Sequence, residues 1–314
     1  MPNARKIHKQ PIPRLGGVAI WLSVTLAFIL YVIINAHYPY GNGLSGILLG
    51  GSILFLLGFV DDLYDLKPHF KLIIQIGAAV LAFLLGVRIE ILSNPMGEIV
   101  NLGLLSLPIT VVWLVGTTNA VNFIDGVDGL AGGVTTIMAI TLGVVALYSD
   151  QPASALIAVM LAGAMMGFLV FNFNPARIFM GDSGALFAGF VLAGLSVSGF
   201  VKSIALSILL PMLIFTVPIM DMSFSVIRRI LKGHNPMIAD DEHIHHKLIK
   251  AGLSANRTSS VLYILCFAGG AIATYMVGAH GLYLVLVVLL ALFMFVFSRL
   301  AKLREYREMK RAEH

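Results

Sequence analysis

Long apolar runs follow one another along almost the whole of this 314-residue chain. A helix needs roughly 20 predominantly apolar residues to cross the hydrocarbon core of a bilayer. Because 58% of the residues are hydrophobic and only 12% are charged, a soluble globular fold is excluded. Runs near the required length lie at residues 18–36, 45–60, 72–87, 104–119, 131–148, 153–171, 185–200, 203–224, 258–278 and 281–298. The sequence therefore predicts an all-α, polytopic transmembrane helical bundle of about ten helices.

The segments between these runs indicate one domain. They contain no internal repeat and no linker long enough to separate domains, so we expect a single integral membrane domain over residues 1–314. The connection at 88–103 alternates apolar residues around the turn-prone pair Asn94-Pro95, which predicts a small β-hairpin. The tail at 299–314 is expected to continue as a helix beyond the membrane, with its charges facing water and lipid headgroups.

The basic residues predict the orientation. When the connections are assigned alternately to the two sides of the membrane, all of the 21 Lys and Arg except Arg88 and Lys202 fall on one side. That side, which carries both termini, is expected to be cytoplasmic. The net charge of +5 is thus explained by topology and anionic lipids, and no nucleic-acid-binding motif is present. The single cysteine, Cys266, lies in an apolar run and is expected to be a packing residue.

Two adjacent carboxylates, Asp61 and Asp62, end one apolar run. A charge at bilayer depth costs roughly 2.5 to 3.5 kcal/mol on insertion scales, so such residues need a compensating role. Adjacent carboxylates repel unless a cation or a proton lies between them, which indicates either a Mg²⁺ environment or a general base. Solvation of a loop is the competing interpretation. Lys67 and Lys71 follow and would suit a phosphate, although both also fit the positive-inside pattern.

Four polar residues recur at steps of three at the end of another apolar run, at Asn119, Asn122, Asp125 and Asp128. On an α-helix neighbouring members of such a series can meet, while the first and last point apart. We therefore expect the chain to tighten or break near the two glycines of this segment, which would gather amides and carboxylates. Capping of two helices is the alternative, but it needs fewer polar groups.

A third polar segment precedes the run at 185–200. Asp182 and the serine after it can cap the following helix and leave backbone N–H groups for an anion. Arg177 adds a charge suited to phosphate. Capping alone would not explain Asn172, Arg177 and Phe179 together. Phe179 could stack on a nucleobase, or it could simply pack.

The longest polar connection contains His243, His245 and His246, which are candidate ligands for a phosphate or a metal. A zinc site is disfavoured because the segment has neither cysteine nor the glutamate of an HExxH helix. Asp221 lies in an apolar run before this connection. It is either a functional carboxylate or, as we favour, a structural partner for one of the two arginines that follow it.

Five segments occur in order along the chain: PIPRLGG (11–17), GFVDDLYDLKP (58–68), NAVNFIDGVDGLAGG (119–133), NPARIFMGDSG (174–184) and HIHHKL (243–248). Together they resemble the motifs of the polyprenyl-phosphate N-acetylhexosamine-1-phosphate transferases, which form glycosyltransferase family 4. The likeness extends over nearly the whole chain and is nearest to the WecA/TagO branch, which uses UDP-N-acetylglucosamine. MraY, which uses UDP-MurNAc-pentapeptide, has a different pattern with three adjacent histidines.

The resemblance implies transfer of a sugar 1-phosphate from a UDP-sugar to undecaprenyl phosphate, with release of UMP. This is the first lipid-linked step of a surface polymer of the teichoic acid or O-antigen type. The reaction would use Mg²⁺, with Mn²⁺ as a substitute, in cytoplasmic loops that form the active site at the bacterial plasma (inner) membrane. A homodimer is a further expectation from the family.

The resemblance also implies roles for the residues. Asp61 and Asp62 would lie by the lipid phosphate, with Asp61 a candidate to deprotonate it, and Asp182 would be the Mg²⁺ ligand. Both members of the aspartate pair are further candidate metal ligands. The remaining residues would bind the nucleotide, the diphosphate or the sugar: Asn119, Asn122, Asp125, Asp128, Asn172, Arg177, Phe179, His243, His245, His246, Lys67 and Lys71.

The chain differs from the usual family pattern in one respect, and two other interpretations of its function stay open. The family usually has an additional transmembrane helix before the segment that matches the start of this chain. Another UDP-sugar, such as UDP-GalNAc, a deoxyhexosamine derivative or UDP-MurNAc-pentapeptide, would use the same chemistry. An ion-coupled transporter would instead place its charges near helix midpoints within paired repeats, and neither feature is present.

Overall fold

The computed structural model describes residues 12–35, 43–93, 99–198, 209–231 and 243–312. Within these residues, eight helices are long and apolar enough to cross a membrane. They are α1 (Gly16–Ile34), α2 (Leu44–Tyr64), α4 (Ser106–Phe123), α5 (Leu130–Tyr148), α6 (Pro152–Asn172), α7 (Gly181–Ser198), α11 (Ala255–Met276) and α12 (His280–Ala312). The shorter helix α3 (Pro68–Leu84) is also apolar. The prediction of an all-α, polytopic membrane protein is confirmed.

The start of the run expected at 203–224, residues 203–208, lies outside the described residues, and the rest of the run is not one continuous helix. The structure instead has α8 (Leu209–Ile214) and α9 (Thr216–Leu231), which meet at Phe215. Pro218 lacks the N–H that a continuous helix would use there, and a proline is tolerated only in the first turn of a new helix. Helix α9 then continues past the predicted end of the run, so its last turn carries two arginines.

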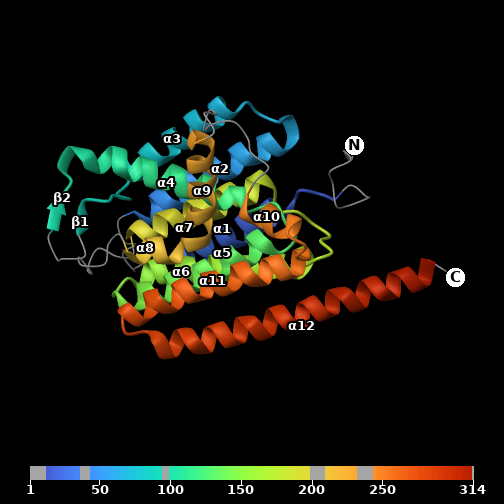
Figure 1. Cartoon of the computed structure of the whole chain (residues 1–314). Helices are drawn as coiled ribbons and strands as arrows, with labels where there is room; N and C mark the ends of the chain where they lie inside the picture. Colours follow the sequence, from blue (N-terminus) through green and yellow to red (C-terminus); the bar gives the residue numbers. More distant parts are fainter. Residues whose placement is uncertain (1–11, 36–42, 94–98, 199–208, 232–242, 313–314) are drawn as a thin grey trace.

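The hairpin predicted at 88–103 is confirmed. Strands β1 (Ile91–Ser93) and β2 (Ile99–Asn101) pair antiparallel, and a short 3₁₀ helix, η1 (Gly103–Leu105), leads into α4. At the other end of the molecule lies the short helix α10 (Ile244–Lys250). Figure 1 shows the hairpin on the left, with α10 on the right. The C-terminal part of α12 extends beyond the bundle on that same side, as the sequence predicts.

Helices α5 and α7 form the centre of the bundle and are buried along almost their whole lengths. Helix α7 packs against α1, α2 and α4. Close approach requires glycine at two positions, because a Cβ at Gly58 would overlap the backbone of Asp182 and Ser183, and a Cβ at Gly17 would overlap that of Gly184. Small residues commonly let membrane helices approach in this way. These contacts hold the start of α7 against the ends of α1 and α2.

We expect Gly58→Ala to separate α2 from α7 at this contact, because the neighbouring atoms belong to backbone that cannot rotate away. Overpacking of this kind costs about 1–3 kcal/mol, and misplacement of the site residues should lower activity by about tenfold to a hundredfold. Thermal unfolding in detergent and an activity assay would measure both. Gly163→Ala is the control, since a Cβ there meets nothing within 4 Å. Equal behaviour of the two variants would contradict the packing argument.

Candidate active site

The polar residues predicted from the sequence gather at one end of the bundle. Helices α2, α4 and α6 end there, and helices α3, α5 and α7 begin there. The helix order thus brings together side chains that are more than 100 residues apart in the sequence. Figure 1 shows this end on the side of α10, opposite the hairpin.

Lys71 joins two of the predicted carboxylates. Its Nζ lies 2.7 Å from Oδ2 of Asp61 and 3.0 Å from Oδ2 of Asp182. The other oxygen of Asp61 accepts the N–H of Leu66 at 2.8 Å. Both oxygens of Asp61 therefore accept a hydrogen bond, and Asp61 is buried. The side chain of Asp182, by contrast, remains 31% exposed. The three groups form a carboxylate–lysine cluster, defined as Asp61, Lys71 and Asp182.

Asp62 bonds the start of α7. Its Oδ1 accepts the N–H of Asp182 at 3.1 Å, and its Oδ2 accepts both the N–H of Ser183 at 3.1 Å and the hydroxyl of Ser183 at 3.0 Å. Arg14 lies 3.6 Å from the same carboxylate. The sequence led us to expect these N–H groups to be open to a bound anion. That expectation is wrong for Asp182 and Ser183, because a carboxylate from α2 already caps this helix.

Asp125 lies in the break between α4 and α5. The helix ends at Phe123 and the next one begins at Leu130, as the paired glycines predict, with Gly129 in the left-handed region at φ 76°. Burial, and then the charges of Asp182 and Asp62, raise the pKa of the Asp125 carboxyl to about 7. The break therefore places Asp125 in the same electrostatic environment as the start of α7. An added cation would favour the charged form of this group.

Asp128 and Asn172 bind the connection between α6 and α7. Oδ2 of Asp128 accepts the N–H of Ala176 at 2.9 Å and the amide of Asn174 at 3.2 Å. Asn172 is buried, where it accepts the N–H of Gly129 and donates to the carbonyl of Ile178, both at 2.9 Å. These two predicted binding residues thus hold the loop between α6 and α7 in place.

The two other predicted residues of that loop, Arg177 and Phe179, form hydrogen bonds through their backbone atoms. Arg177 is exposed, and its N–H donates to the carbonyl of Phe171. Phe179 is half-buried, with its N–H bonded to the carbonyl of Pro13 and its carbonyl bonded to the N–H of Gly16. The start of α1 is therefore joined to the rim of the site by backbone hydrogen bonds.

Asn119 pairs with a residue that the sequence analysis did not single out. Its amide donates to Gln75 Oε1 at 2.7 Å, and Gln75 donates back to Asn119 Oδ1 at 3.3 Å. Gln75 is buried on α3, four residues after Lys71, so both lie on one face of the helix. This spacing within an apolar run was the available signal. The pair fixes α3 against α4, which positions Lys71. Asn122, one turn later on α4, is half-buried.

The first of the three predicted histidines, His243, is held by α9. Nδ1 of His243 lies 2.8 Å from Oδ2 of Asp221. Asp221 is therefore a structural partner as favoured from the sequence, but its partner is a histidine and not the arginine we expected. The rings of His243 and His245 are parallel, with centroids 5.8 Å apart. The centroid of the His246 ring lies 4.2 Å from that of His245.

Two of the predicted binding residues differ in their surroundings. His245 is only 1% exposed, and burial, together with the nearby His246, lowers the pKa of its imidazole to about 4. It is therefore neutral at pH 7 and contributes no positive charge. Lys67, by contrast, is exposed at the residue before α3. The structure thus places Lys71 between the carboxylates of Asp61 and Asp182 but leaves Lys67 exposed at the surface.

The carboxylates fit a magnesium ion. Within the described part of the chain, no group of three His, Cys, Asp or Glu side chains is already arranged as a metal cage. Magnesium does not require one, because it is commonly held by one or two carboxylates together with substrate phosphates. Asp182 is partly open, and the pKa of Asp125 is raised first by burial and then by the neighbouring carboxylates of Asp182 and Asp62. The side chains that could hold the ion thus supply oxygen ligands, and the site contains more carboxylates than basic groups.

Comparison with known proteins gives several relatives. A probable undecaprenyl-phosphate N-acetylglucosaminyl 1-phosphate transferase of Bacillus subtilis is 39% identical over 268 residues, covering 85% of this chain and 74% of the relative. A decaprenyl-phosphate N-acetylglucosaminephosphotransferase of Mycobacterium leprae is 33% identical, covering 84% and 73%. An undecaprenyl-phosphate alpha-N-acetylglucosaminyl 1-phosphate transferase of Escherichia coli is 26% identical, covering 85% and 73%.

The family model described as glycosyl transferase family 4 matches residues 44–200. This range includes every helix from α2 to α7, and with them the carboxylate–lysine cluster, Asp62 and the break that carries Asp125. The resemblance inferred from the five sequence motifs is confirmed by this match and by the relatives. The chain belongs to glycosyl transferase family 4.

Proposed function

We propose that the protein transfers N-acetylglucosamine 1-phosphate from UDP-N-acetylglucosamine to undecaprenyl phosphate, giving undecaprenyl-diphospho-N-acetylglucosamine and UMP. The observation that carries this proposal is the carboxylate–lysine cluster, which lies at one end of a membrane bundle, where its Asp182 also acts electrostatically on the buried carboxyl of Asp125. The names of the relatives supply the sugar and the polyprenyl phosphate.

The reaction forms a bond between an oxygen of the acceptor phosphate and the sugar-bearing phosphorus of the donor. The bond from that phosphorus to the oxygen that remains on UMP breaks. Phosphoryl transfer depends mainly on positioning and on neutralising charge. Lys71 offsets negative charge beside the acceptor phosphate. Both oxygens of Asp61 are bonded, to Lys71 and to the N–H of Leu66, so Asp61 could accept a proton from that phosphate only when one of these bonds is released. Asp62 does not react in this scheme, and instead holds the start of α7 so that Asp182 faces the cluster.

Asp182 and Asp125 are the residues that would hold Mg²⁺. A bound Mg²⁺ would neutralise charge on the diphosphate and favour departure of UMP. Asp128 and Asn172 keep the connection after α6 in place at the edge of this site. The exposed Arg177 lies on that connection and is suited to bind a diphosphate oxygen through its guanidinium.

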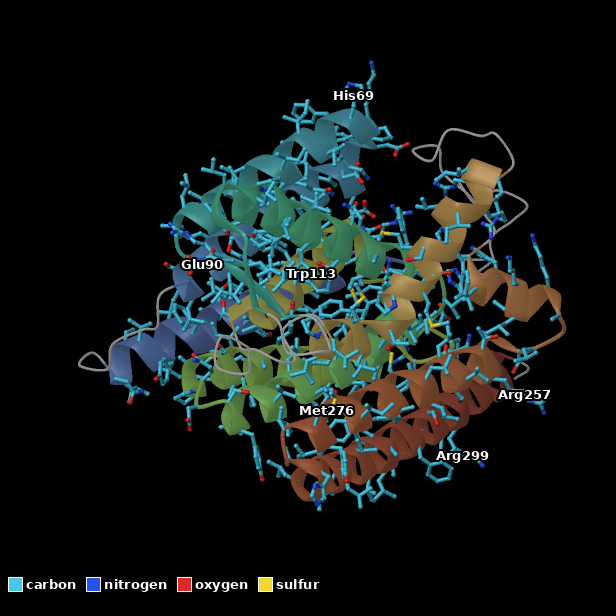
Figure 2. The ribbon with its side chains drawn as sticks, turned by 60° about the vertical axis from the view of Figure 1, so that its left-hand side comes forward. His69, Glu90, Trp113, Arg257, Met276 and Arg299 are labelled. Carbon is cyan, nitrogen blue, oxygen red and sulfur yellow. The ribbon has the colours of Figure 1, made fainter. Side chains whose placement is uncertain are left out.

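A largely apolar cavity supports a polyprenyl acceptor. It has a volume of about 650 Å³, and it is lined at the hairpin end by residues 88–92 and further in by residues of α4, the end of α7, α8 and α9. Trp113, which lies in the middle of the bundle in Figure 2, lines it and donates from Nε1 to Ser196 at 3.0 Å. Thr117 marks one end, two residues before Asn119. An isoprenoid chain in this cavity would bring its phosphate toward the cluster through the membrane interior.

The distribution of charge supports a cytoplasmic site. Among the described residues, Arg88 is the one Lys or Arg at the hairpin end, next to Glu90, which Figure 2 shows on the side opposite Arg257. The cluster end carries Arg14, Lys67, Lys71, Arg177, Arg228, Arg229, Lys247, Lys250, Arg257 and Arg299. By the positive-inside rule this end faces the cytoplasm. UDP-sugars are made there, so the donor would reach the site without crossing the membrane.

The proposal is tested by measuring UMP release from the purified protein in detergent with undecaprenyl phosphate and Mg²⁺. UDP-GlcNAc, UDP-GalNAc and UDP-MurNAc-pentapeptide are supplied in separate reactions. We expect release with UDP-GlcNAc that requires both the lipid and a divalent ion, with Mn²⁺ supporting a lower rate. Release with one of the other donors instead would retain the chemistry and change the sugar. No release with any donor would reject the transferase proposal.

A further inference from the structure

Asp221 lies outside the predicted catalytic set, yet it is buried and both of its carboxylate oxygens are bonded. It projects from α9, is 2% exposed, and uses both oxygens. Oδ2 lies 2.8 Å from Nδ1 of His243, and Oδ1 accepts the N–H of Ile244 at 2.6 Å. A buried carboxylate is stable only when it is paired in this way. Asp221 thus joins α9 to the first residues of α10.

The bond to His243 fixes which ring nitrogen carries hydrogen. An ionised carboxylate can only accept, so Nδ1 of His243 must be the donor. In the neutral ring this leaves Nε2 as an acceptor, and in the protonated ring Nε2 becomes a second donor. Asp221 therefore sets both the orientation and the tautomer of this histidine.

The effect of this bond reaches the active site through two further contacts. The ring of His243 lies 5.4 Å from that of Phe123, at the end of α4, and parallel to that of His245. Nε2 of His245 is buried without a hydrogen-bond partner and faces Gly126, where a Cβ would approach it to 2.5 Å. Gly126 follows Asp125 directly. The path from Asp221 thus ends against the turn that holds a proposed metal ligand.

We propose that Asp221 is a positioning residue for the transfer reaction. It acts through His243 to hold α10 and its histidines against the turn between α4 and α5. This inference rests on the proposed function for its effect on catalysis, but the attachment of α10 can be measured without any substrate. Asp221 itself does not touch the substrate.

The test is a double-mutant cycle with Asp221→Asn, His243→Gln and the two together. Asp221→Asn keeps an oxygen for the N–H of Ile244 but removes the charge that orients His243. We expect kcat/KM to fall by roughly 10- to 100-fold, as is typical for groups that orient a site histidine. The double variant should be no slower than His243→Gln alone, because Asp221 acts through that ring. Asp221→Glu, which keeps the charge, should recover part of the loss.

Asp150→Asn is the matched control. The same chemical change is made at the far end of α5, in a turn whose φ of 55° asparagine tolerates. Its activity should equal that of the wild type. Losses that multiply in the double variant, or an Asp221→Asn enzyme as active as the control, would overturn the inference. If Asp221→Asn does not fold, the same cycle is run with Asp221→Glu, whose effect should disappear when His243 is replaced.

A second readout is independent of activity. Lys247 and Lys250 lie on α10, and tryptic cleavage after them reports how firmly this helix is held. We expect faster cleavage in Asp221→Asn and in His243→Gln, and an unchanged rate in Asp150→Asn. Equal rates in all three would reject the attachment. A wild-type protein that released no UMP would count against the proposed function alone, and the cleavage rates would still decide the role of Asp221.

Discussion

Asp182→Asn is expected to lower UMP release by about 10²- to 10³-fold, a loss similar to that caused by removing one group that stabilises transition-state charge. Asparagine has the same shape and keeps an oxygen for Lys71, so the bundle should remain folded. The negative charge that would hold Mg²⁺ is lost, however, and the variant should need more Mg²⁺ for half-maximal activity. Release of UMP as a function of Mg²⁺ concentration measures both effects.

The control for Asp182→Asn is its thermal unfolding in detergent, which should match that of the wild type to within a few degrees. The cap at the start of α7 involves the backbone N–H of Asp182, which the substitution preserves. Wild-type activity with an unchanged Mg²⁺ requirement would remove Asp182 from the proposed metal site. Loss of folding would instead assign it a structural role.

Lys71→Met should have the second large effect, with a loss of about a hundredfold in turnover. Methionine fills a similar volume but leaves Asp61 and Asp182 without the ammonium between them. Two carboxylates that face one another bind a divalent ion more strongly when no competing cation is present. We therefore expect Mg²⁺ to bind more tightly while turnover falls, a combination that simple unfolding would not produce. Isothermal titration with Mg²⁺, beside the UMP assay, measures the two quantities.

Lys67→Met provides the comparison, because it removes the same charge four residues earlier at an exposed position. Its loss of activity should be much smaller than that of Lys71→Met. If the two variants behaved alike, the effect would come from the general charge of this surface, and the specific bridge to Asp61 and Asp182 would carry no weight. Weaker Mg²⁺ binding in Lys71→Met would also contradict the argument.

Features that depend on local chain chemistry could be predicted from the sequence. Alternating residues around Asn94-Pro95 predicted the hairpin, and the two glycines after Asp125 predicted the break between α4 and α5. The length of the apolar runs predicted most of the bundle, but not the division at Phe215, because hydropathy does not register the missing N–H of Pro218. Such patterns act within a few residues of one another.

Contacts between distant segments could not be predicted in the same way. The sequence indicated that Asp62 and Asp221 were unusual, yet their partners lie about 120 and 22 residues away. Which donor meets each carboxylate depends on helix packing, which glycines such as Gly58 determine through close approach. Gln75 was missed because its one signal, a spacing of four residues from Lys71 within an apolar run, does not show which residue the amide pairs with. The sequence therefore predicted which types of residue gather in the site, but not which hydrogen bonds and ion pairs join them.

The bond between Asp62 and α7 also constrains how the protein is made. Asp62 is synthesised 120 residues before the N–H groups that it caps. At roughly 5–20 residues per second, that interval is about 6 to 24 seconds. Among the described residues that bond Asp62, Arg14 is the one that precedes it in the chain. Arg14 can therefore neutralise this carboxylate during synthesis, until the ribosome delivers α7 and the N–H groups of that helix join Arg14 at Asp62.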